Sequence, residues 1–565
     1  MNILGINPGH NGSVALISNG ETIYYSEEER LSKHKYDSNP FRGMLEILKN
    51  YKIDHLAMAG TGDLQYPKVN WTEEDLFTCL VRKFNNKFEA TNFCNVHHKG
   101  HAACAFYNSG FEKALVVIVD GAGSYYKIDE SSTGIRLQGY EAESLWLCEY
   151  PAKFTCLRVN YGDNYCTPMN DGERYFGDSV TITKAYEAVS HFLGFNFIEA
   201  GKTMGLSSYG KEDKNIPNLL YNGRGNKNLF HPVYPAGAMV NCSLKDDSLY
   251  VGRDADEWHK DPSKLTEFEK NIAWKIQQES QIEVGNLIEE GIKKTGVTNV
   301  AIAGGYGLNC VANYYFKDRF KDINLYCEPI SHDGGTAIGV AKLVWHEKTE
   351  DLTIRPQKSI YYGTKYKDDD ILKVINNLDD FEKTTVNYED VAKLIFERNI
   401  VCIFQGRSEA GPRALGNRSI LYDPSDPNGK DTVNKVKGRE WFRPFAGSIL
   451  EENANEWFDM KGLDSSPFMM YAVNVLDDKV DKIPCITHVD KTCRIQTVNR
   501  EQNLHYYNLI KEFYNLSGIP ILFNTSFNLA GDPLVETIDD AIKSMRDSDL
   551  KLLYLPELNM LLTKK

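Results

Sequence analysis

Two histidines and two aspartates are the residues best suited to bind a metal ion. His97 and His101 lie in HHKGHA, at the start of a predicted helix that ends before Gly110. Their spacing places both imidazoles on one helix face. Asp120 follows the apolar stretch ALVVIV and Asp333 opens the loop DGGTAIG, so both occupy carboxyl ends of predicted strands, where α/β proteins gather ligands. Two imidazoles and two carboxylates suit iron, manganese or zinc, whereas a histidine pair alone is also compatible with a structural role.

Two glycine-rich turns follow predicted strands and lead into predicted helices. They are GGYGLN, from Gly304 to Asn309, and DGGTAIG, which contains Gly335. Backbone N–H groups at such helix starts can face phosphate oxygens, although tight turns alone also explain glycine at these positions. Lys202 lies in a GKT triplet, but Asn196 stands where a phosphate-binding P-loop needs glycine, so that interpretation is rejected.

Basic residues are concentrated between positions 401 and 450. This window holds eight basic and five acidic residues in a chain of formal net charge −14. The bases alternate with Gly, Pro, Ala and Ile, which favours a pocket built from loops. Arginine and lysine bind phosphate and carboxylate groups, so a triphosphate and a second phosphorylated substrate would explain their density. A solvated charged surface is the alternative.

His10 lies in the first tight turn, NPGHNG. An imidazole that titrates near neutral pH could remove a proton from an acceptor hydroxyl. A turn histidine taken alone also fits a structural role.

The elements that must position these residues form an α/β pattern. A strand, a glycine-rich turn and a second strand occupy residues 2–17, and Asn19-Gly20 predicts a hairpin. Buried strands precede the glycine turns. Residues 265–296 predict a long amphipathic helix that stops at Gly296. The polar stretch 347–357 is the predicted domain boundary, and a second α/β pattern follows it.

The composition of the chain argues against several classes of function. The 565 residues include 64 Lys and Arg against 78 Asp and Glu, which disfavours non-specific binding of polyanions through bulk charge. The amino terminus lacks a secretory pattern, and no run of about 18 apolar residues occurs. Twelve cysteines without a Cys-x-x-Cys pair fit reduced thiols. We therefore expect a cytoplasmic protein with no membrane partner.

Taken in order, several motifs make the chain resemble the NodU/TobZ family of O-carbamoyltransferases. The motifs are HHxxHA, VDGAG, GKTMGLSSYG, GGYGLNCVAN, HDGGTAIG, GRSEAGPRALGNRSI, KGREWFRPFA and NTSFN. The resemblance spans nearly the whole chain. It implies an α/β fold with an actin/sugar-kinase-like (Kae1-like) domain over residues 1–350 and a YrdC-like domain over 356–565.

The resemblance also implies a reaction and its residues. In such enzymes the YrdC-like part makes carbamoyl-adenylate from carbamoyl phosphate and ATP, which carries Mg²⁺, and releases pyrophosphate; the Kae1-like part transfers the carbamoyl group to a hydroxyl. The implied metal ligands, typically to iron, are His97, His101, Asp120 and Asp333. The residues implied in catalysis are His10, Arg413, Lys437, Arg439, Arg443, Arg494 and Asn524. Those implied in nucleotide binding are Gly304, Gly305, Asn309, Gly335, Arg418, Ser526 and Asn528.

The chain departs from the family pattern at one position, and several alternatives for its function stay open. Many family members have His-Asp in the first turn, whereas this chain has His10-Asn11, and asparagine cannot act as a carboxylate base. The acceptor is expected to be a small-molecule hydroxyl, with 5-hydroxymethylcytosine in DNA as the second option. Threonylcarbamoyl-type RNA modification and a non-catalytic nucleotide-binding regulator are the rivals of other classes. A homodimer is one option for assembly.

Overall fold

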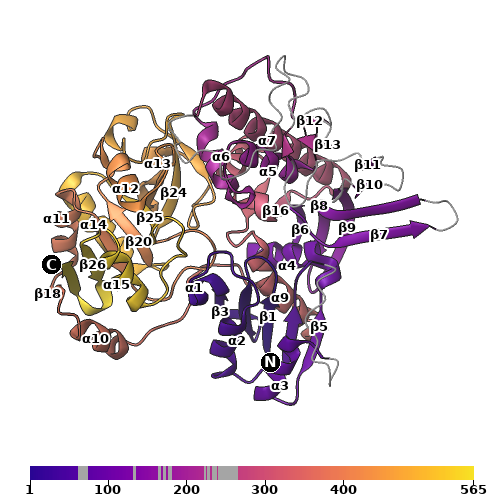
Figure 1. The fold of residues 1–565 in the computed structure, drawn as a ribbon, viewed down its shortest axis with the longest axis horizontal. Helices are drawn as coiled ribbons and strands as arrows, with labels where there is room; N and C mark the ends of the chain where they lie inside the picture. The colour runs from indigo at the N-terminus through magenta and orange to yellow at the C-terminus, as the bar shows by residue number, and fades with distance from the viewer. Residues whose placement is uncertain are drawn as a thin grey trace. The chain divides into compact units, whose positions relative to one another are not determined.

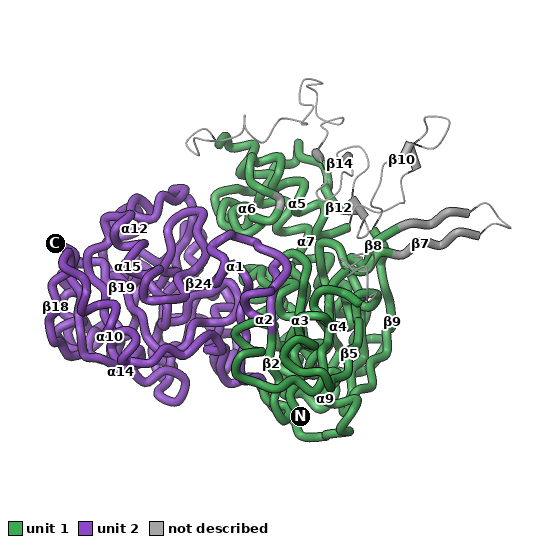
Figure 2. Tube along the Cα trace, turned by 60° about the horizontal axis from the view of Figure 1, so that its bottom comes forward, with its two compact units in different colours: residues 1–10, 15–21, 45–356 green, residues 11–14, 22–44, 357–565 purple. Residues whose placement is uncertain are grey.

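The structure is a computed structural model that groups the chain into two compact units (Figure 2). It describes residues 1–61, 74–130, 135–162, 167–168, 174–175, 181–221, 224–225, 230–231, 238–239 and 265–565. The first unit comprises residues 1–10, 15–21 and 45–356, and the second comprises residues 11–14, 22–44 and 357–565.

The amino-terminal sheet has five strands in the order β3-β2-β1-β4-β5. Their bounds are β1 Asn2–Asn7, β2 Ser13–Ser18, β3 Glu21–Glu27, β4 His55–Met58 and β5 Glu89–Asn92. Asn19 and Gly20 both have positive φ, 50° and 84°, which is the backbone that a two-residue hairpin turn needs. The predicted hairpin is therefore confirmed.

The next sheet repeats this plan, in the order β17-β16-β6-β8-β7, with β9 paired to β8. Its strands are β6 Lys113–Val119, β7 Tyr125–Glu130, β8 Ile135–Glu149, β9 Lys153–Gly162, β16 Asn299–Ala303 and β17 Asn324–Cys327. Central β6 pairs with antiparallel β8 on one side and parallel β16 on the other, as β1 lies between β2 and parallel β4. Two sheets of one plan agree with the expected actin/sugar-kinase-like domain. Three two-stranded pairs complete the described strands of residues 1–356. They are β10 Thr167–Pro168 with β11 Arg174–Tyr175, β12 Leu220–Tyr221 with β13 Arg224–Gly225, and β14 Phe230–His231 with β15 Ala238–Met239.

The described helices of residues 1–356 include some that pack on these sheets (Figure 1). They are α1 Glu28–Ser32, α2 Phe41–Leu48, α3 Leu76–Phe84, α4 His97–Ser109, α5 Ile182–Phe192, α6 Ala200–Ser207, α7 Glu267–Thr295, α8 Cys310–Arg319 and α9 Thr336–Thr349. The predicted long helix is α7, which begins with a capping box from Thr266 to Glu269 and ends at Gly296 with φ 67°. Within the described ranges, no helix has both the length and the apolar character to cross a membrane.

Helices α4 and α9 pack with their backbones in close contact. A β-carbon at Gly339 of α9 would lie 2.0 Å from the carbonyl oxygen of Gly100 in α4, which is far inside van der Waals contact. Helix α9 also packs on β1 and β4, and α4 packs on β6 and β16. The two helices are therefore fixed to both sheets and to each other.

The second unit is built on a ten-stranded sheet, in the order β18-β27-β26-β19-β20-β25-β21-β24-β23-β22. The strands are β18 Phe381–Thr385, β19 Val401–Phe404, β20 Arg418–Tyr422, β21 Ala446–Leu450, β22 Phe458–Asp459, β23 Ala472–Val475, β24 Thr492–Val498, β25 Ile521–Ser526, β26 Leu552–Leu555 and β27 Met560–Lys564. The helices are α10 Asp368–Asn376, α11 Tyr388–Phe396, α12 Gly429–Lys437, α13 Ala454–Trp457, α14 Leu504–Ser517 and α15 Ile538–Arg546. The α/β fold class is confirmed in both units.

Successive residues of the central strands pack alternately into two separate hydrophobic cores in this unit. Cys402 and Ile420 pack with residues of α10 and α15, whereas Val401, Ile403 and Leu421 pack with residues of α11 and α14. This alternation follows from the two-residue repeat of a strand. The sheet therefore carries helices on both faces.

An amino-terminal segment, residues 22–44, belongs to the second unit. The Tyr25 amide donates to the Tyr362 carbonyl at 3.1 Å, and the Arg30 guanidinium donates to the Gly411 carbonyl at 2.7 Å. The Arg407 guanidinium donates to the Ile23 carbonyl at 2.6 Å. The predicted domain 1–350 includes this segment, whereas its contacts in the structure group it with residues 357–565.

The contact of α4 with α9 generates a stability prediction. We expect Gly339→Ala to lower the free energy of unfolding by about 1 to 3 kcal/mol, because the new methyl group must push the two backbones apart. Thermal and urea unfolding measure this change. Gly201→Ala, in α6 with no atom near its added carbon, should change stability by less than about 1 kcal/mol. Equal stability of the two variants would contradict the predicted overlap.

Candidate functional site

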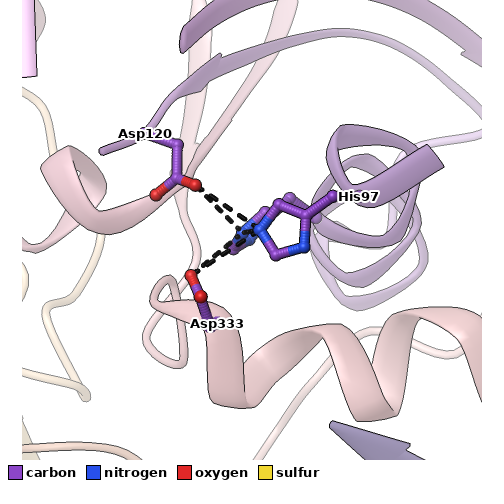
Figure 3. Close-up of side chains that lie close together, drawn as sticks. His97, Asp120 and Asp333 are labelled. Atoms are coloured by element: carbon purple, nitrogen blue, oxygen red, sulfur yellow. Dashed lines mark hydrogen bonds and ion pairs between the residues drawn. The ribbon is translucent and has the colours of Figure 1, made fainter. Parts of the chain in front are cut away.

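The four predicted metal ligands converge on one point, and Figure 3 shows three of them, His97, Asp120 and Asp333. The Nε2 atoms of His97 and His101 are 3.0 Å apart. Asp120 Oδ2 lies 3.4 Å from His97 Nε2 and 3.9 Å from His101 Nε2, and Asp333 Oδ1 lies 3.7 and 3.6 Å from the same two atoms. One ligand atom from each of the four residues lies within 4.8 Å of all the others. The structure therefore brings the predicted quartet together.

Three elements supply the quartet. The histidines occupy one face of α4, Asp120 follows the last residue of β6, and Asp333 begins the short 3-10 helix Asp333–Gly335 that leads into α9. His97 Nδ1 lies 3.2 Å from the Gly60 carbonyl oxygen, so a proton on Nδ1 is held there and Nε2, which faces the carboxylates, is the nitrogen that would bind a metal. The Gly305 amide donates to Asp120 Oδ1 at 3.0 Å, which orients the carboxylate.

Opposite charges dominate the electrostatics of the quartet. Burial lowers the pKa of His97, but Asp333 and Asp120 outweigh it, so this pKa is raised well above the usual value. Burial raises the pKa of Asp120, as does neighbouring Asp333, but bonding to His97 and the charge of His101 leave it lowered. The two carboxylates are therefore ionised at neutral pH and attract a positive charge to this point.

The geometry fits a single divalent cation. Bonds of about 2.1 Å to nitrogen and oxygen place adjacent ligand atoms roughly 3.0 to 3.4 Å apart in octahedral and tetrahedral centres. The separations that involve a histidine run from 3.0 to 3.9 Å, and all four ligand atoms lie within 4.8 Å of one another, so side-chain rotations would complete coordination. Imidazole nitrogen with carboxylate oxygen is a donor set for iron, manganese or zinc. The identity of the metal stays a prediction.

The glycine turns lie beside the quartet. Gly304 has φ 85°, and a β-carbon there would lie 2.4 Å from the Val119 carbonyl oxygen at the end of β6. Among the described residues, the one atom near an added carbon at Gly305 is Asp120 Oδ1, at 3.6 Å, so its remaining side is clear of the described side chains. A carbon at Gly335 would lie 1.9 Å from the Ile330 carbonyl oxygen, so glycine is required there for packing.

The structure also gives the surroundings of two further predicted residues, Asn309 and His10. Asn309 caps α8 by accepting from the Ala312 amide at 3.0 Å, and its amide group donates to Gln277 at 3.0 Å. His10 lies in the turn between β1 and β2 with an exposed side chain, and Asn11 has φ 55°, which asparagine tolerates. Their nucleotide-binding and proton-accepting roles stay predictions.

Cations gather around Arg439 in the second unit. Burial lowers the pKa of Arg439 to about 9, and the charges of Arg443 and Arg494 act in the same direction. Burial, Arg439 and Arg443 hold the pKa of Lys437 well below its usual value. Among the described residues, Arg443 forms an ion pair with Glu440 alone, at 3.6 Å. Such mutual repulsion is unfavourable unless an anion binds between the charges.

Lys437 joins this cluster to β25, which carries Asn524 and Ser526, and to Asn528 just after it. Its ammonium group donates to the carbonyl oxygen of Ser526, to the Ser526 hydroxyl at 3.3 Å and to Asn528 Oδ1 at 3.1 Å. Asn524, on the same strand, donates to the Ser448 hydroxyl at 3.0 Å and the Ala414 carbonyl at 3.2 Å. The structure therefore brings Lys437, Ser526 and Asn528 into direct contact.

Buried polar atoms without a hydrogen-bond partner among the described residues remain on Asn524 of β25 and Arg494 of β24. Asn524 and Arg494 both pair with Ala446 across β25, β21 and β24. Asn524 Oδ1 and Arg494 Nε are buried and have no hydrogen-bond partner among the described residues. A buried polar atom without a partner costs about 1 to 3 kcal/mol, so these atoms are suited to a ligand.

Arg418 and Arg413 differ in their surroundings. Arg418 is fully buried, stacks 3.7 Å from the Phe404 ring centroid, and donates to the carbonyl oxygens of Gln405, Gly406, Asn417 and Glu536. The bonds to Gln405, Gly406 and Asn417 hold the backbone before and after residues 407–416, and the bond to Glu536 ties it to a distant segment. Arg413 lies in that loop, partly exposed. The assigned roles of both residues stay predictions.

Lys35 is a member of the cluster that sequence reasoning missed. Partial loss of solvent lowers its pKa, as do the charges of Arg443 and Arg439, whereas Glu29 opposes them. Its place in residues 22–44 puts it in the same unit as those arginines. No local motif signals this role, because more than 400 positions separate Lys35 from Arg439 and Arg443 in the printed sequence.

Comparisons with known proteins agree for both parts of the chain. Residues 45–342 match the family model described as Carbamoyltransferase N-terminus, and residues 392–564 match Carbamoyltransferase C-terminus. The chain is 28% identical to the nodulation protein NolNO of Sinorhizobium fredii, over 96% of this chain and 77% of that protein. It is 24% identical to the 3'-hydroxymethylcephem-O-carbamoyltransferase of Streptomyces clavuligerus, over 96% of each.

Solved structures give only a distant match. HypF of T. kodakarensis aligns with a TM-score of 0.34 and 14% identity, covering 63% of this chain and 49% of that one. The activator of 2-hydroxyisocaproyl-CoA dehydratase from Clostridium difficile aligns with a TM-score of 0.32 and 11% identity, covering 62% and 96%.

The quartet generates a metal-binding prediction. We expect the intact chain to hold about one divalent ion, and His101→Ala to weaken its binding by at least about a hundredfold, since even indirect support of a ligand is worth 10- to 100-fold. Anaerobic equilibration with iron(II), manganese(II) or zinc(II), followed by metal analysis, measures the content. His346→Gln is the matched control, because this buried histidine of the same unit bonds to the Asp351 carbonyl instead. Retention of the ion by His101→Ala would contradict the assignment.

Proposed function

The chain belongs to the carbamoyltransferase family, and on that premise we propose that it activates a carbamoyl group with ATP and transfers it to a hydroxyl. The proposed reaction forms carbamoyl-adenylate from carbamoyl phosphate and Mg²⁺-bound ATP. Transfer to the hydroxyl then releases AMP. The acceptor is proposed to be a small molecule.

The cation cluster around Arg439 is the observation that carries this proposal. Lys35, Lys437, Arg439, Arg443 and Arg494 interact with one another as like charges. Two like charges about 4 Å apart repel each other by about 1 kcal/mol in water and by about 4 kcal/mol near a protein surface. ATP and carbamoyl phosphate are both strongly anionic, so binding them together would relieve the repulsion among the cations and offset the repulsion between the substrates.

Atom balance defines the products of the first step. Carbamoyl-adenylate keeps the α-phosphorus of ATP and no phosphorus from carbamoyl phosphate. Water must therefore cleave carbamoyl phosphate to carbamate and inorganic phosphate. A carbamate oxygen then attacks the α-phosphorus, and the bond to pyrophosphate breaks. Arg439 and its neighbours would hold the phosphate groups in line for this displacement and stabilise the charge on the departing pyrophosphate.

The quartet supports the transfer step. His97, His101, Asp120 and Asp333 would hold a divalent cation, proposed to be iron, which would supply Lewis-acid stabilisation of phosphate charge. The clear side of Gly305 next to Asp120 leaves room for a phosphate near that point. The named activity of the Streptomyces relative, on a hydroxymethyl group of a small molecule, favours the same class of acceptor here.

The charge cluster generates a prediction about activity and stability together. We expect Arg439→Gln to lower carbamoyl phosphate-dependent pyrophosphate release by at least about tenfold, since a charge-assisted hydrogen bond is worth about 1.5 to 3 kcal/mol. The free energy of unfolding of the ligand-free variant should stay equal or rise, because one repelling charge is removed. Coupled pyrophosphate assays and urea unfolding measure the two effects.

Arg398→Gln is the control for this prediction. Arg398 is mostly exposed and lies 3.7 Å from Asp426, so its replacement should leave pyrophosphate release unchanged. If the wild-type chain released no pyrophosphate with both substrates, or if Arg439→Gln retained full activity, the proposed assignment would be wrong.

A further inference from the structure

A carboxylate that the preceding mechanism does not use lies next to the metal quartet. Glu187 occupies α5, and its Oε1 would be 2.8 Å from a β-carbon at Gly121, the residue after Asp120. Its side chain is 12% exposed, so it is largely enclosed. Any side chain at position 121 would displace it. Glycine at that position therefore allows Glu187 to lie against the loop that carries a metal ligand.

A lysine on the same helix holds one oxygen of this carboxylate. Lys184 Nζ donates to Glu187 Oε2 at 2.7 Å, and the lysine side chain is 8% exposed. Among the described residues, no group donates a hydrogen bond to Oε1. The ion pair thus fixes the orientation of the carboxylate while its second oxygen remains available.

The charged groups that face Glu187 have opposing effects. Burial raises the pKa of Glu187 to about 7, and Asp120 acts in the same direction, whereas Lys184 lowers it. A carboxyl group with a pKa near the operating pH can both take up and release a proton. Burial also raises the pKa of Glu143 to about 7, but both of its oxygens are used, by the Ile182 amide at 2.9 Å and the Asn160 side chain at 3.1 Å.

We propose that Glu187 Oε1 accepts the proton of the acceptor hydroxyl during carbamoyl transfer. The inference rests on the proposed function. A bond forms between the hydroxyl oxygen and the carbamoyl carbon, and the bond from that carbon to the phosphate oxygen of AMP breaks. The electron pair leaves with AMP, and the hydroxyl proton passes to Glu187 and then to solvent. Lys184 is a positioning residue, because it acts through the carboxylate.

This assignment addresses the departure at the first turn. His10 is followed by Asn11 rather than by a carboxylate, and its side chain is exposed. Glu187 is a carboxylate that the fold places beside Asp120, from a distant part of the sequence. The geometry thus gives the transfer step a proton acceptor that does not depend on position 11.

The test separates the two half-reactions in the full chain. Glu187→Gln and the wild type are loaded with ATP and carbamoyl phosphate, and pyrophosphate from the first turnover is measured. Discharge is then followed as AMP release with 3'-hydroxymethylcephem, the acceptor named for the Streptomyces relative, and separately with hydroxylamine. Hydroxylamine attacks without prior deprotonation, so it does not require a base.

We expect Glu187→Gln to retain the first-turnover pyrophosphate and hydroxylamine discharge within twofold, and to lose about 100-fold in discharge to the hydroxyl. Glu143→Gln, the matched control, should retain all three rates. Unchanged discharge to the hydroxyl in Glu187→Gln would overturn the proposal, as would an equal loss with hydroxylamine, which indicates a structural role. Wild type that discharges to hydroxylamine but not to the alcohol would also overturn it. Wild type without pyrophosphate release would instead contradict the proposed function.

Discussion

The contact between α4 and α9 is the constraint on which the metal quartet depends. The histidines come from α4, and Asp333 begins the turn that leads into α9. Their ligand atoms can lie within 4 Å only if the two helices approach almost backbone to backbone, which glycine permits at Gly339, next to the Gly100 carbonyl. Asp120 reaches the same point because α4 also packs on β6. Packing therefore sets the geometry of the centre before any ion binds.

Two arginines of the second unit, Arg418 and Arg439, differ in their surroundings and therefore in their roles. Arg418 is fully buried, and backbone carbonyl oxygens accept its hydrogen bonds, so its charge is neutralised by dipoles. Arg439 instead faces Arg443 and Arg494, and the hydrogen bond that it donates to the Thr525 hydroxyl is long, at 3.3 Å. The first arrangement stabilises the loop, whereas the second is unfavourable in isolation. Charge concentrated without matching acids is typical of a site selected for binding rather than for stability.

The sequence allowed accurate prediction where local signals determine structure. The helix over residues 265–296 and the hairpin at Asn19-Gly20 follow from periodicity and turn chemistry within short windows. The quartet was predictable because two of its members share a helix face, Asp120 follows a strand and Asp333 opens a glycine-rich turn. Lys35 and Glu187 could not be found in this way. Each reaches its position through pairing of elements far apart in the chain, and neither lies in a motif that signals its neighbours.

The grouping of residues 22–44 with the carboxyl-terminal unit has a consequence for how such proteins can be divided or recombined. A fragment that starts at Gln357 would lack Tyr25, Arg30 and Lys35, which bond to or face that unit. Exchange of carboxyl-terminal halves between homologues at residue 356 would also combine a foreign sheet with a native amino-terminal segment. Compatible hybrids would require this segment to travel with the half that it completes, although it lies at the opposite end of the gene.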